Sequence, residues 1–161
     1  MQFSDEQFNQ VKNDAEKFYF EIKSVHCPYF GEKVNFNRKG FDHIVSKSWN
    51  RGRSEADQFS RFRYISLAPE IIKQSRTLQG FRVTRKFERV KVHNRWDTVM
   101  KNVYYFELIA VVNFHNSQIR LKIIIKQIEG GEKFFFSIIP FWKIDKETGE
   151  RILYDNNLEH E

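Results

Sequence analysis

The sequence predicts an α+β domain in which N-terminal helices precede a four-strand antiparallel β-meander with one basic face. Two observations indicate this order. Apolar residues recur at helical spacing near the N-terminus, whereas residues 81–141 are rich in β-branched and aromatic residues and are interrupted by short turns. Consecutive strands joined by short turns pair antiparallel, so a parallel sheet is not expected.

Four segments in the first half of the chain carry helix signals. Ser4 and Gln7 have the spacing of a capping box, and the apolar residues that follow recur every three or four positions. Ser54 is the predicted N-cap of a later helix, and Pro69 suits the first turn of the last one. The predicted helices are residues 5–23, 41–48, 55–65 and 70–75, with an extended segment at 33–37.

The strands are predicted from alternation and from turn residues. In the third strand apolar and basic side chains alternate, so each set occupies one face of the sheet. The apolar face is expected to pack against the helices, which leaves the basic face outside. The predicted strands are residues 81–92, 103–114, 118–128 and 133–141; the apolar set is Ile119, Leu121, Ile123 and Ile125, and the cations are Arg120, Lys122 and Lys126.

The length and the charge distribution predict one domain with an anionic polymer as its partner. A chain of 161 residues fits a single domain, assigned to residues 1–144, with residues 145–161 as an acidic mobile tail. The formal charge is +6 overall, and residues 36–100 alone carry +9. A basic centre between acidic ends favours binding to nucleic acid, and a solvated basic surface is the alternative.

Several classes of protein lack their signals in this sequence. Cys27 is the only cysteine, so an internal disulfide is impossible and a reducing compartment is expected. The N-terminus lacks the apolar segment of a signal peptide, and no apolar run is long enough to span a bilayer. We therefore expect a cytoplasmic protein without a membrane partner. No HExxH, P-loop, GxSxG or carboxylate cluster is present, so neither a metal nor a cofactor is expected.

A few residues are candidates for proton transfer and phosphate binding. His43 and Lys47 lie one helical turn apart; histidine transfers protons near neutral pH, and a nearby lysine favours its neutral form. On the last hairpin, Lys126 is expected beside Phe135 or Ser137, where a cation, a ring and a hydroxyl suit a phosphate and a stacked base. A structural histidine and solvated cations are the alternatives.

Three stretches of the sequence resemble a known nuclease family. They are residues 36–44 (FNRKGFDHI), the segment from Arg53 through Arg61-Phe62-Arg63 to Pro69-Glu70-Ile71-Ile72, and residues 126–137 (KQIEGGEKFFFS). Together they resemble the phage-associated members of the barnase–EndoU–colicin–RelE-like nuclease superfamily. That family has N-terminal helices followed by a four-strand antiparallel sheet, and its members are thought to be mostly metal-independent ribonucleases.

The resemblance implies an endoribonuclease that cleaves RNA through attack of the ribose 2′-OH, with tRNA, rRNA or mRNA as substrate. Because such nucleases are often toxins or phage-borne effectors, it also implies a cognate immunity or antitoxin protein. It places His43, as the preferred base, in a catalytic set with Arg61, Lys126 and Ser137, assisted by Lys47 and Arg53. The basic sheet face and the arginine-rich helix add Arg63, Arg120, Lys122 and Phe135 as candidate RNA contacts.

Two other functions are compatible with the same residues. A non-catalytic nucleic-acid-binding domain would use the basic face without cleaving RNA, and a protein-interaction module would use it to bind an acidic protein. The sequence departs from the family in its long strands between residues 81 and 114 and in its acidic tail. Binding of RNA without cleavage would identify the first alternative, and weak affinity for nucleic acid at physiological salt would identify the second.

Overall fold

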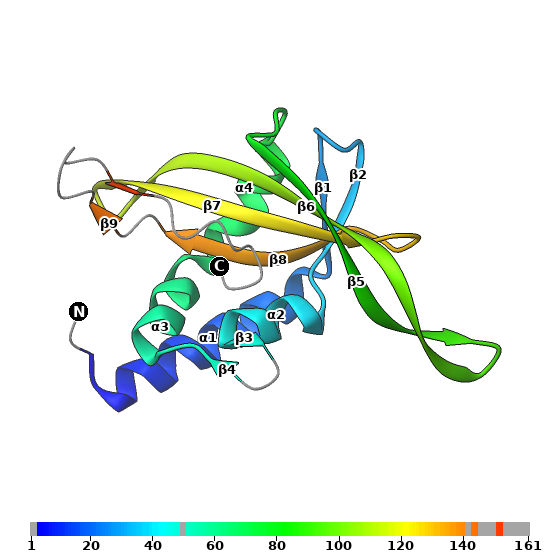
Figure 1. Ribbon diagram of the computed structural model, residues 1–161. Coiled ribbons are helices and arrows are strands. Elements are labelled where there is room, and N and C mark those ends of the chain that lie inside the picture. The colour runs from blue at the N-terminus through cyan, green and yellow to red at the C-terminus, as the bar shows by residue number, and fades with distance from the viewer. Residues whose placement is uncertain (1–2, 49–50, 141–142, 145–150, 153–161) are drawn as a thin grey trace.

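The computed structural model describes residues 3–48, 51–140, 143–144 and 151–152. It confirms an α+β architecture in which helices pack against a six-stranded sheet (Figure 1). None of the described helices has both the length and the apolar character that a membrane crossing needs.

The helices come first in the chain and the long strands follow them. The helices are α1 (Asp5–Ile22), α2 (Arg38–Val45), α3 (Glu55–Tyr64) and α4 (Ala68–Gln74), with a 3-10 turn η1 (Ile65–Leu67) before α4. The short strands are β1 (Ser24–Cys27), β2 (Glu32–Asn35), β3 (Ser46–Ser48), β4 (Arg51–Gly52), β9 (Lys143–Ile144) and β10 (Arg151–Ile152). The long strands are β5 (Gly80–Val92), β6 (Arg95–Phe114), β7 (Ser117–Ile128) and β8 (Phe134–Pro140). Most of the predicted tail, residues 145–161, lies outside the described residues, although β10 within it pairs with β9.

The long strands form an antiparallel meander, but the sheet continues beyond it. Its order is β1-β2-β8-β7-β6-β5, and β2 pairs with β8 in parallel through Asn35 and Phe134. The sheet is therefore mixed and has six strands, which corrects the expectation of four antiparallel ones. Strand β1 has four residues, too few for alternation to identify it in the sequence, whereas β2 coincides with most of the extended segment predicted at residues 33–37.

The core lies between the sheet and the helices, on the face that the sequence assigned to it. Leu121, Ile123 and Ile125 are fully buried, and Ile119 packs against the same cluster. Helix α1 inserts Tyr19 into this core, and the Tyr19 hydroxyl donates a hydrogen bond to the Asn37 carbonyl oxygen at 2.8 Å. Helix α1 is thereby connected to the residue that precedes α2.

The opposite face of the sheet is not the open basic surface that the sequence predicted. Lys122 is only 4% exposed, and its Nζ lies 3.7 Å from Glu107 Oε2 on the neighbouring strand. Ile124, on the same side as Lys122, is fully buried in a second apolar cluster. Of the three predicted surface cations, Arg120 is exposed and Lys126 is half-buried. The expectation of one basic face is corrected accordingly.

A β-bulge changes which side chains of β8 face the core. Ile124 pairs with Ser137 and Ile125 with Phe135, so β8 contains one residue more than β7 at this point. The extra residue, Phe136, joins the second apolar cluster, while Phe135 enters the main core. Alternation therefore holds on each side of the bulge but fails across it.

Helix α2 starts earlier than the sequence predicts because Asn37 caps it. The Asn37 side chain accepts a hydrogen bond from Gly40 N at 3.1 Å, and the helix then runs from Arg38 to Val45. Residues 46–48, predicted as helix, form β3 and pair with β4. Gly40 lets α2 approach β8 closely, since a Cβ there would lie 2.1 Å from the Phe135 carbonyl oxygen. The other predicted helices are confirmed to within two residues at each end.

Strand β6 begins at Arg95, well before its predicted start at residue 103, and pairs with β5. His93 and Asn94 form the turn between the two strands, with φ angles of 47° and 63°. The last pair between β6 and β7 joins Val103 to Ile128, so residues 85–102 project from the sheet as a two-stranded arm (Figure 1). The sequence missed this part of β6 because its side chains are mixed and mostly exposed.

We expect Gly40→Ala to lower stability, because the new Cβ would overlap the Phe135 carbonyl oxygen and force α2 away from β8. Overpacking of this kind costs about 1–3 kcal/mol, or roughly 2–12 °C in the thermal midpoint of a domain of this size. Thermal unfolding followed by circular dichroism measures the effect. Gly52→Ala is the control, since a Cβ there meets nothing within 4 Å. An equal loss in both variants would contradict the close approach.

Candidate active site

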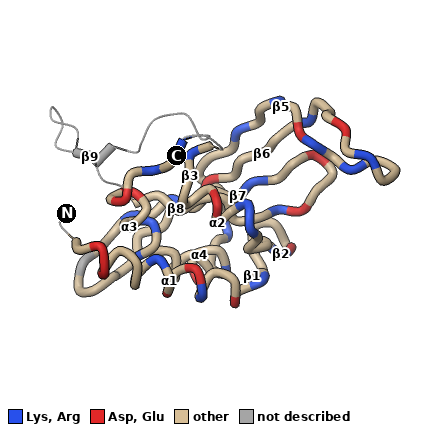
Figure 2. Tube along the Cα trace, turned by 90° about the horizontal axis from the view of Figure 1, so that it is seen from below, with Lys and Arg blue, Asp and Glu red and all other residues tan. Residues whose placement is uncertain are grey.

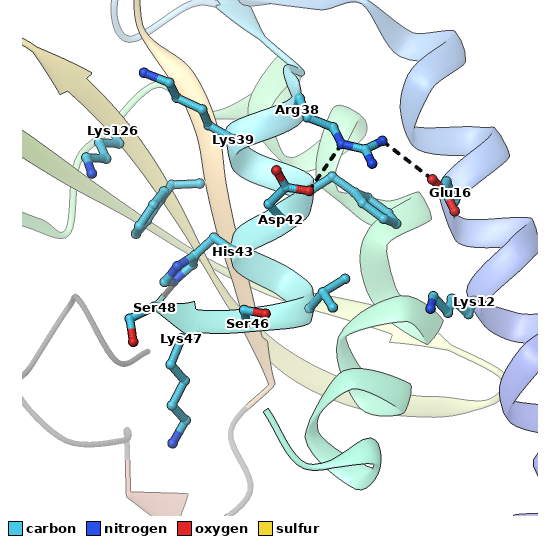
Figure 3. Close-up of a pocket in the computed structure, with 13 residues that line it drawn as sticks. Lys12, Glu16, Arg38, Lys39, Asp42, His43, Ser46, Lys47, Ser48 and Lys126 are labelled. Atoms are coloured by element: carbon cyan, nitrogen blue, oxygen red, sulfur yellow. Dashed lines mark ion pairs between the residues drawn. The ribbon is translucent and has the colours of Figure 1, made fainter. Parts of the chain in front are cut away.

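A pocket lies beside α2, between α1 on one side and β7 and β8 on the other (Figure 3). Its volume is about 630 Å³, within the range that is typical of ligand sites. Figure 3 shows Lys39, His43 and Lys126 around one side of it and Lys12 and Glu16 on the other. Its lining is Lys12, Glu16, Arg38, Lys39, Phe41, Asp42, His43, Val45, Ser46, Lys47, Ser48, Lys126 and Phe136.

The pocket has an excess of positive charge. Five lysine and arginine residues line it, together with two acids. Both acids contact the same cation: Arg38 Nη1 lies 3.6 Å from Glu16 Oε1, and Arg38 Nε lies 3.2 Å from Asp42 Oδ1. The four lysines of the lining therefore dominate the charge of the remaining surface, which favours an anionic ligand such as a phosphate.

Lys126 is the titratable group on the sheet side of the pocket. Its Nζ lies 4.7 Å from the centre of the Phe136 ring and 5.5 Å from the centre of the Tyr105 ring. Burial is the main cause that lowers the pKa of Lys126 to about 8; Glu88 opposes this shift, and the charges of Lys86 and Lys39 add to it. A fraction of Lys126 is thus neutral near physiological pH and able to accept a proton.

His43 is held in place by contacts on two sides. Its ring stacks on Phe136 with ring centres 3.8 Å apart, and its carbonyl oxygen accepts a hydrogen bond from Arg53 Nε at 3.0 Å. Arg53 Nη2 lies 3.1 Å from His43 Nε2. Because a guanidinium only donates, Nε2 must be the acceptor, which makes the ring neutral with its proton on Nδ1. The basic nitrogen of His43 is therefore already engaged.

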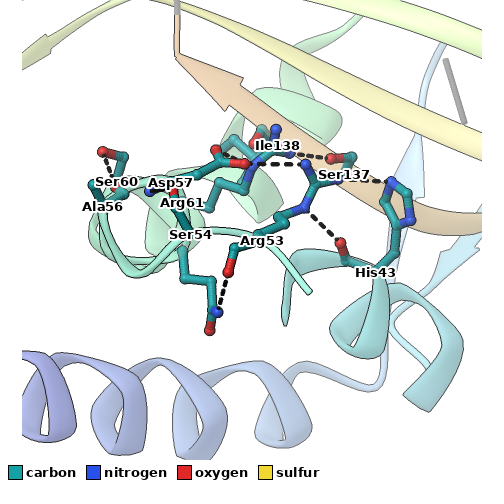
Figure 4. Close-up of polar contacts among 10 residues, drawn as sticks. His43, Arg53, Ser54, Ala56, Asp57, Ser60, Arg61, Ser137 and Ile138 are labelled. Carbon is teal, nitrogen blue, oxygen red and sulfur yellow. Dashed lines mark hydrogen bonds and ion pairs between the residues drawn. The ribbon is translucent and has the colours of Figure 1, made fainter. Parts of the chain in front are cut away.

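Behind the pocket, polar contacts join α2, α3 and β8 (Figure 4). Asp57 accepts hydrogen bonds from Arg53 Nη1 at 3.1 Å and from Arg61 Nε at 2.8 Å. Arg61 Nη1 donates to Ser137 Oγ at 2.6 Å and to the Ile138 carbonyl oxygen at 3.1 Å. Strand β2 pairs with β8 only through Asn35 and Phe134, so the Ile138 carbonyl oxygen lies beyond this pairing and accepts its hydrogen bond from Arg61 instead.

Asp57 is ionised because its two arginine partners outweigh the cost of burying it. Burial raises the pKa of Asp57, but the charges and hydrogen bonds of Arg61 and Arg53 lower it below its ordinary value of 3.8. Burial and the nearby charge of Arg61 lower the pKa of Arg53 to about 10. Arg53 therefore stays charged at neutral pH, and among the described residues Asp57 is the acid that contacts both arginines.

The residues that the resemblance implied come together in one region, but only part of them reach the pocket. His43, Lys47 and Lys126 line the pocket, while Arg53, Arg61 and Ser137 lie in the buried network. Arg61 is 4% exposed and Ser137 is fully buried, so neither is positioned to touch a ligand in the pocket. Arg61 and Ser137 instead fix the helix and the strand on which the pocket depends.

Three predicted RNA contacts lie away from the pocket. The Arg63 guanidinium packs over the Phe114 ring, 5.9 Å from its centre, at the other end of the sheet strands. Arg120 is exposed on β7 but does not line the pocket, and Lys122 is buried beside Glu107. These residues therefore do not belong to the same site as His43 and Lys126.

The prediction that Phe135 stacks on a base is corrected. Phe135 is fully buried and stacks on Phe36 in the core, with ring centres 5.0 Å apart. Lys126, expected beside Phe135 or Ser137, pairs instead with Phe134 and places its ammonium over Phe136. The bulge in β8 is the physical reason, because it exchanges the faces of these aromatic residues.

Sequence reasoning missed three residues of this region. Asp57 lies four positions after Arg53 and four before Arg61, a spacing that brings side chains together on a helix and was available as a signal. Lys39 lies one turn before His43, and it affects Lys126 across the pocket. Phe136 carried no signal, because only the bulge turns it towards His43.

Comparison with known proteins gives this chain no relative: no family model, no curated protein and no solved structure matches it. Among the described residues, no group of three or more His, Cys, Asp and Glu side chains is arranged to hold a metal ion. The function of the pocket is therefore inferred from the chemistry of the residues that line it.

We expect Asp57→Asn to destabilise the protein at neutral pH, because it removes the carboxylate that both buried guanidinium groups contact. The loss should be about 3 kcal/mol, the lower end for breaking a buried ion pair, because the Asp57 side chain is itself 32% exposed. The contribution of Asp57 is present above its ordinary pKa of 3.8 and is lost as the pH falls through the lower pKa of the folded state.

Urea unfolding from neutral pH into the acid range measures both effects. The stability of Asp57→Asn should depend less on pH than that of the wild type. Asp97→Asn is the control, because Asp97 is exposed on the arm and its loss should change stability by no more than about 0.5 kcal/mol. Equal losses in the two variants would show that Asp57 does not hold the network together.

Proposed function

We propose that the protein is a metal-independent endoribonuclease domain that cleaves RNA by transesterification, with the ribose 2′-OH as nucleophile. The observation that carries the proposal is Lys126, an amine with its pKa lowered to about 8 in a basic pocket of ligand size. Deprotonation of a 2′-OH needs a base that titrates near neutral pH. The surrounding cations suit the phosphate that the 2′ oxygen attacks.

In the proposed reaction, neutral Lys126 removes the proton of the 2′-OH and the oxygen attacks the adjacent phosphorus. The P–O5′ bond then breaks, which leaves a 2′,3′-cyclic phosphate on one product and a 5′ oxygen that takes a proton from solvent on the other. The ammonium groups of Lys39 and Lys47, which line the same pocket, stabilise the negative charge that develops on the phosphoryl oxygens.

The roles of the other residues follow from their contacts. His43 is not the base in this proposal, because its Nε2 already accepts from Arg53. Arg61 and Ser137 are positioning residues, since they contact each other behind the pocket. Helices followed by the β5–β8 meander are the arrangement that the nuclease superfamily would require, so membership of that family is part of the proposal. Its RNA substrates, a cytoplasmic location and an immunity partner are proposed with it.

A non-catalytic RNA-binding domain is the second candidate, and one observation favours it. Because His43 Nε2 already accepts a hydrogen bond from Arg53, the proposed cleavage depends on Lys126 alone as its base. If Lys126 served only as a cation for phosphate, the same pocket would bind RNA without cleaving it. The two candidates therefore differ in whether Lys126 acts by losing its proton or by keeping it.

We expect the pure protein to cleave total RNA in the presence of EDTA and to leave 2′,3′-cyclic phosphate ends. Lys126→Ala should reduce the rate by at least about a hundredfold, the usual contribution of a general base. Lys126→Arg should be equally inactive, because arginine keeps the charge but does not lose its proton at working pH. Gel analysis of RNA products measures the rates. Lys73→Ala is the control, since Lys73 on α4 does not line the pocket.

An active Lys126→Arg variant would refute a proton-transfer role for this residue. A wild-type protein that binds RNA and leaves it intact under these conditions would establish the non-catalytic candidate instead.

We expect the cleavage rate to rise about tenfold per pH unit and to level off above about pH 8, because only the neutral amine of Lys126 accepts the proton. Lys39→Gln should move this limb to higher pH, because the charge of Lys39 helps to lower the pKa of Lys126. Single-turnover rates across the pH range measure both. Lys17→Gln, an exposed change on α1 outside the pocket, should leave the limb in place. If the rising part of the pH–rate profile stayed in place in Lys39→Gln, a group other than Lys126 would be the base.

A further inference from the structure

The arm formed by residues 85–102 is exposed and basic, and the proposed reaction does not use it. Each of its strands has eight residues, which project about 24 Å from the last β6–β7 pair at the usual rise of a strand. The arm carries six Lys and Arg residues and two acids, and Figure 2 shows the charged residues along both strands. A two-stranded ribbon is only marginally stable in water by itself. Large apolar side chains that are exposed together on such a ribbon indicate a binding surface.

Strand alternation gives the arm two different faces. One of them, here named the aromatic face, carries Arg85, Phe87, Arg89, Lys91 and Trp96. Phe87 is 69% exposed and Trp96 is 59% exposed. All of residues 85–102 are described, and both acids among them, Glu88 and Asp97, lie on the reverse face. The aromatic face therefore combines exposed rings with three cations and no acid.

The spacing on the aromatic face places a cation next to each ring. Neighbours on one face of a strand are about 6.8 Å apart, so Arg85 and Arg89 flank Phe87 along β5. Arg89 also lies over the Trp96 ring, with Cζ 5.5 Å from the ring centre. Rings that stack on bases, with cations between them for the phosphates, are the features of proteins that bind single-stranded nucleic acid.

We propose that the aromatic face binds single-stranded RNA, with unpaired bases stacked on Phe87 and Trp96 and phosphates bound by Arg85, Arg89 and Lys91. This inference rests on the proposed function for the choice of RNA, and it names the substrate class: RNA with an unpaired segment outside the pocket. The base of the arm lies near the pocket, since Lys86 and Glu88 on its reverse face act on the charge of Lys126. The aromatic face lies on the opposite side of the ribbon from Lys86 and Glu88, so an RNA chain that reached both surfaces would have to pass around the edge of the arm.

The composition of the aromatic face favours this ligand over two others. Duplex RNA has a deep, narrow major groove, and its stacked bases do not present their faces to Phe87 and Trp96. A second copy of the chain would bring the same three cations against each other if two aromatic faces met, and like charges in that position repel. Unpaired RNA offers phosphates to the cations and exposed base faces to the two rings.

A binding experiment with an uncleavable probe tests the inference separately from catalysis. The probe is a fluorescent 2′-O-methyl oligonucleotide of about 12 unpaired nucleotides, within the usual site sizes of about 4–16; it lacks the 2′-OH that the proposed reaction needs. Fluorescence anisotropy compares the wild type with the double variant Phe87→Thr/Trp96→Thr. We expect at least a fivefold loss of affinity, the lower end for one stacked base.

The matched control is Val92→Thr/Val99→Thr, which removes two exposed apolar side chains from the reverse face. It should bind the probe within about twofold of the wild type, and circular dichroism should show both double variants folded. A duplex form of the probe should bind more weakly than the single strand. Tighter binding of the duplex, or an equal loss in the control variant, would overturn the inference.

Two further results would assign the aromatic face to another partner and overturn the inference. One is a dimer in analytical sedimentation that Phe87→Thr/Trp96→Thr abolishes, which would show that the aromatic face binds a second copy of the chain. The other is displacement of the probe by polyglutamate as effectively as by RNA, which would indicate an acidic protein. Arm-dependent binding of the probe by a protein that leaves RNA intact would support the inference and refute the endoribonuclease proposal. Cleavage of RNA by the protein, with probe binding unchanged in Phe87→Thr/Trp96→Thr, would support the endoribonuclease proposal and refute the inference about the arm.

Discussion

Asp57 lies between two arginine side chains that are almost wholly buried, and the arrangement around the pocket depends on it. Arg53 connects this carboxylate to the backbone and ring of His43 on α2, and Arg61 connects it to Ser137 on β8. The hydrogen bonds of these two cations and the carboxylate that they share offset their loss of water. Helix α3 thus determines how α2 meets the sheet.

This network also engages the basic ring nitrogen of the histidine that lines the pocket. Because Arg53 donates to His43 Nε2, the ring is held neutral, and a proton on Nε2 would oppose a charged guanidinium. Lys126 has no such partner on the same network and lies over the Phe136 and Tyr105 rings, where burial lowers its pKa towards neutrality. His43, the base that the sequence suggested, is therefore held in place by its contacts, and Lys126 is the base in the proposed function.

The sheet separates two kinds of surface. Strands β7 and β8 are covered by helices and carry the pocket, whereas β5 and β6 extend beyond the last pair with β7 (Figure 1). The side chains exposed on this extension include aromatic rings and cations. In the proposed function the first region cleaves RNA and the second holds it. In the first region α2 packs closely on β8 at Gly40, whereas beyond the last β6–β7 pair the two strands of the arm pair with each other.

The sequence by itself determined the α+β class, the order of helices and long strands, the apolar face of Ile123 and Ile125, and the basic centre of the chain. These follow from local periodicity and composition, which act over a few neighbouring residues. Only the tertiary structure decided the parallel contact of β2 with β8, the bulge that turns Phe136 towards His43, and the placing of Arg61 behind the pocket. Each of these depends on contacts between residues far apart in the chain, and a single inserted residue in β8 reverses every face that alternation predicts beyond it.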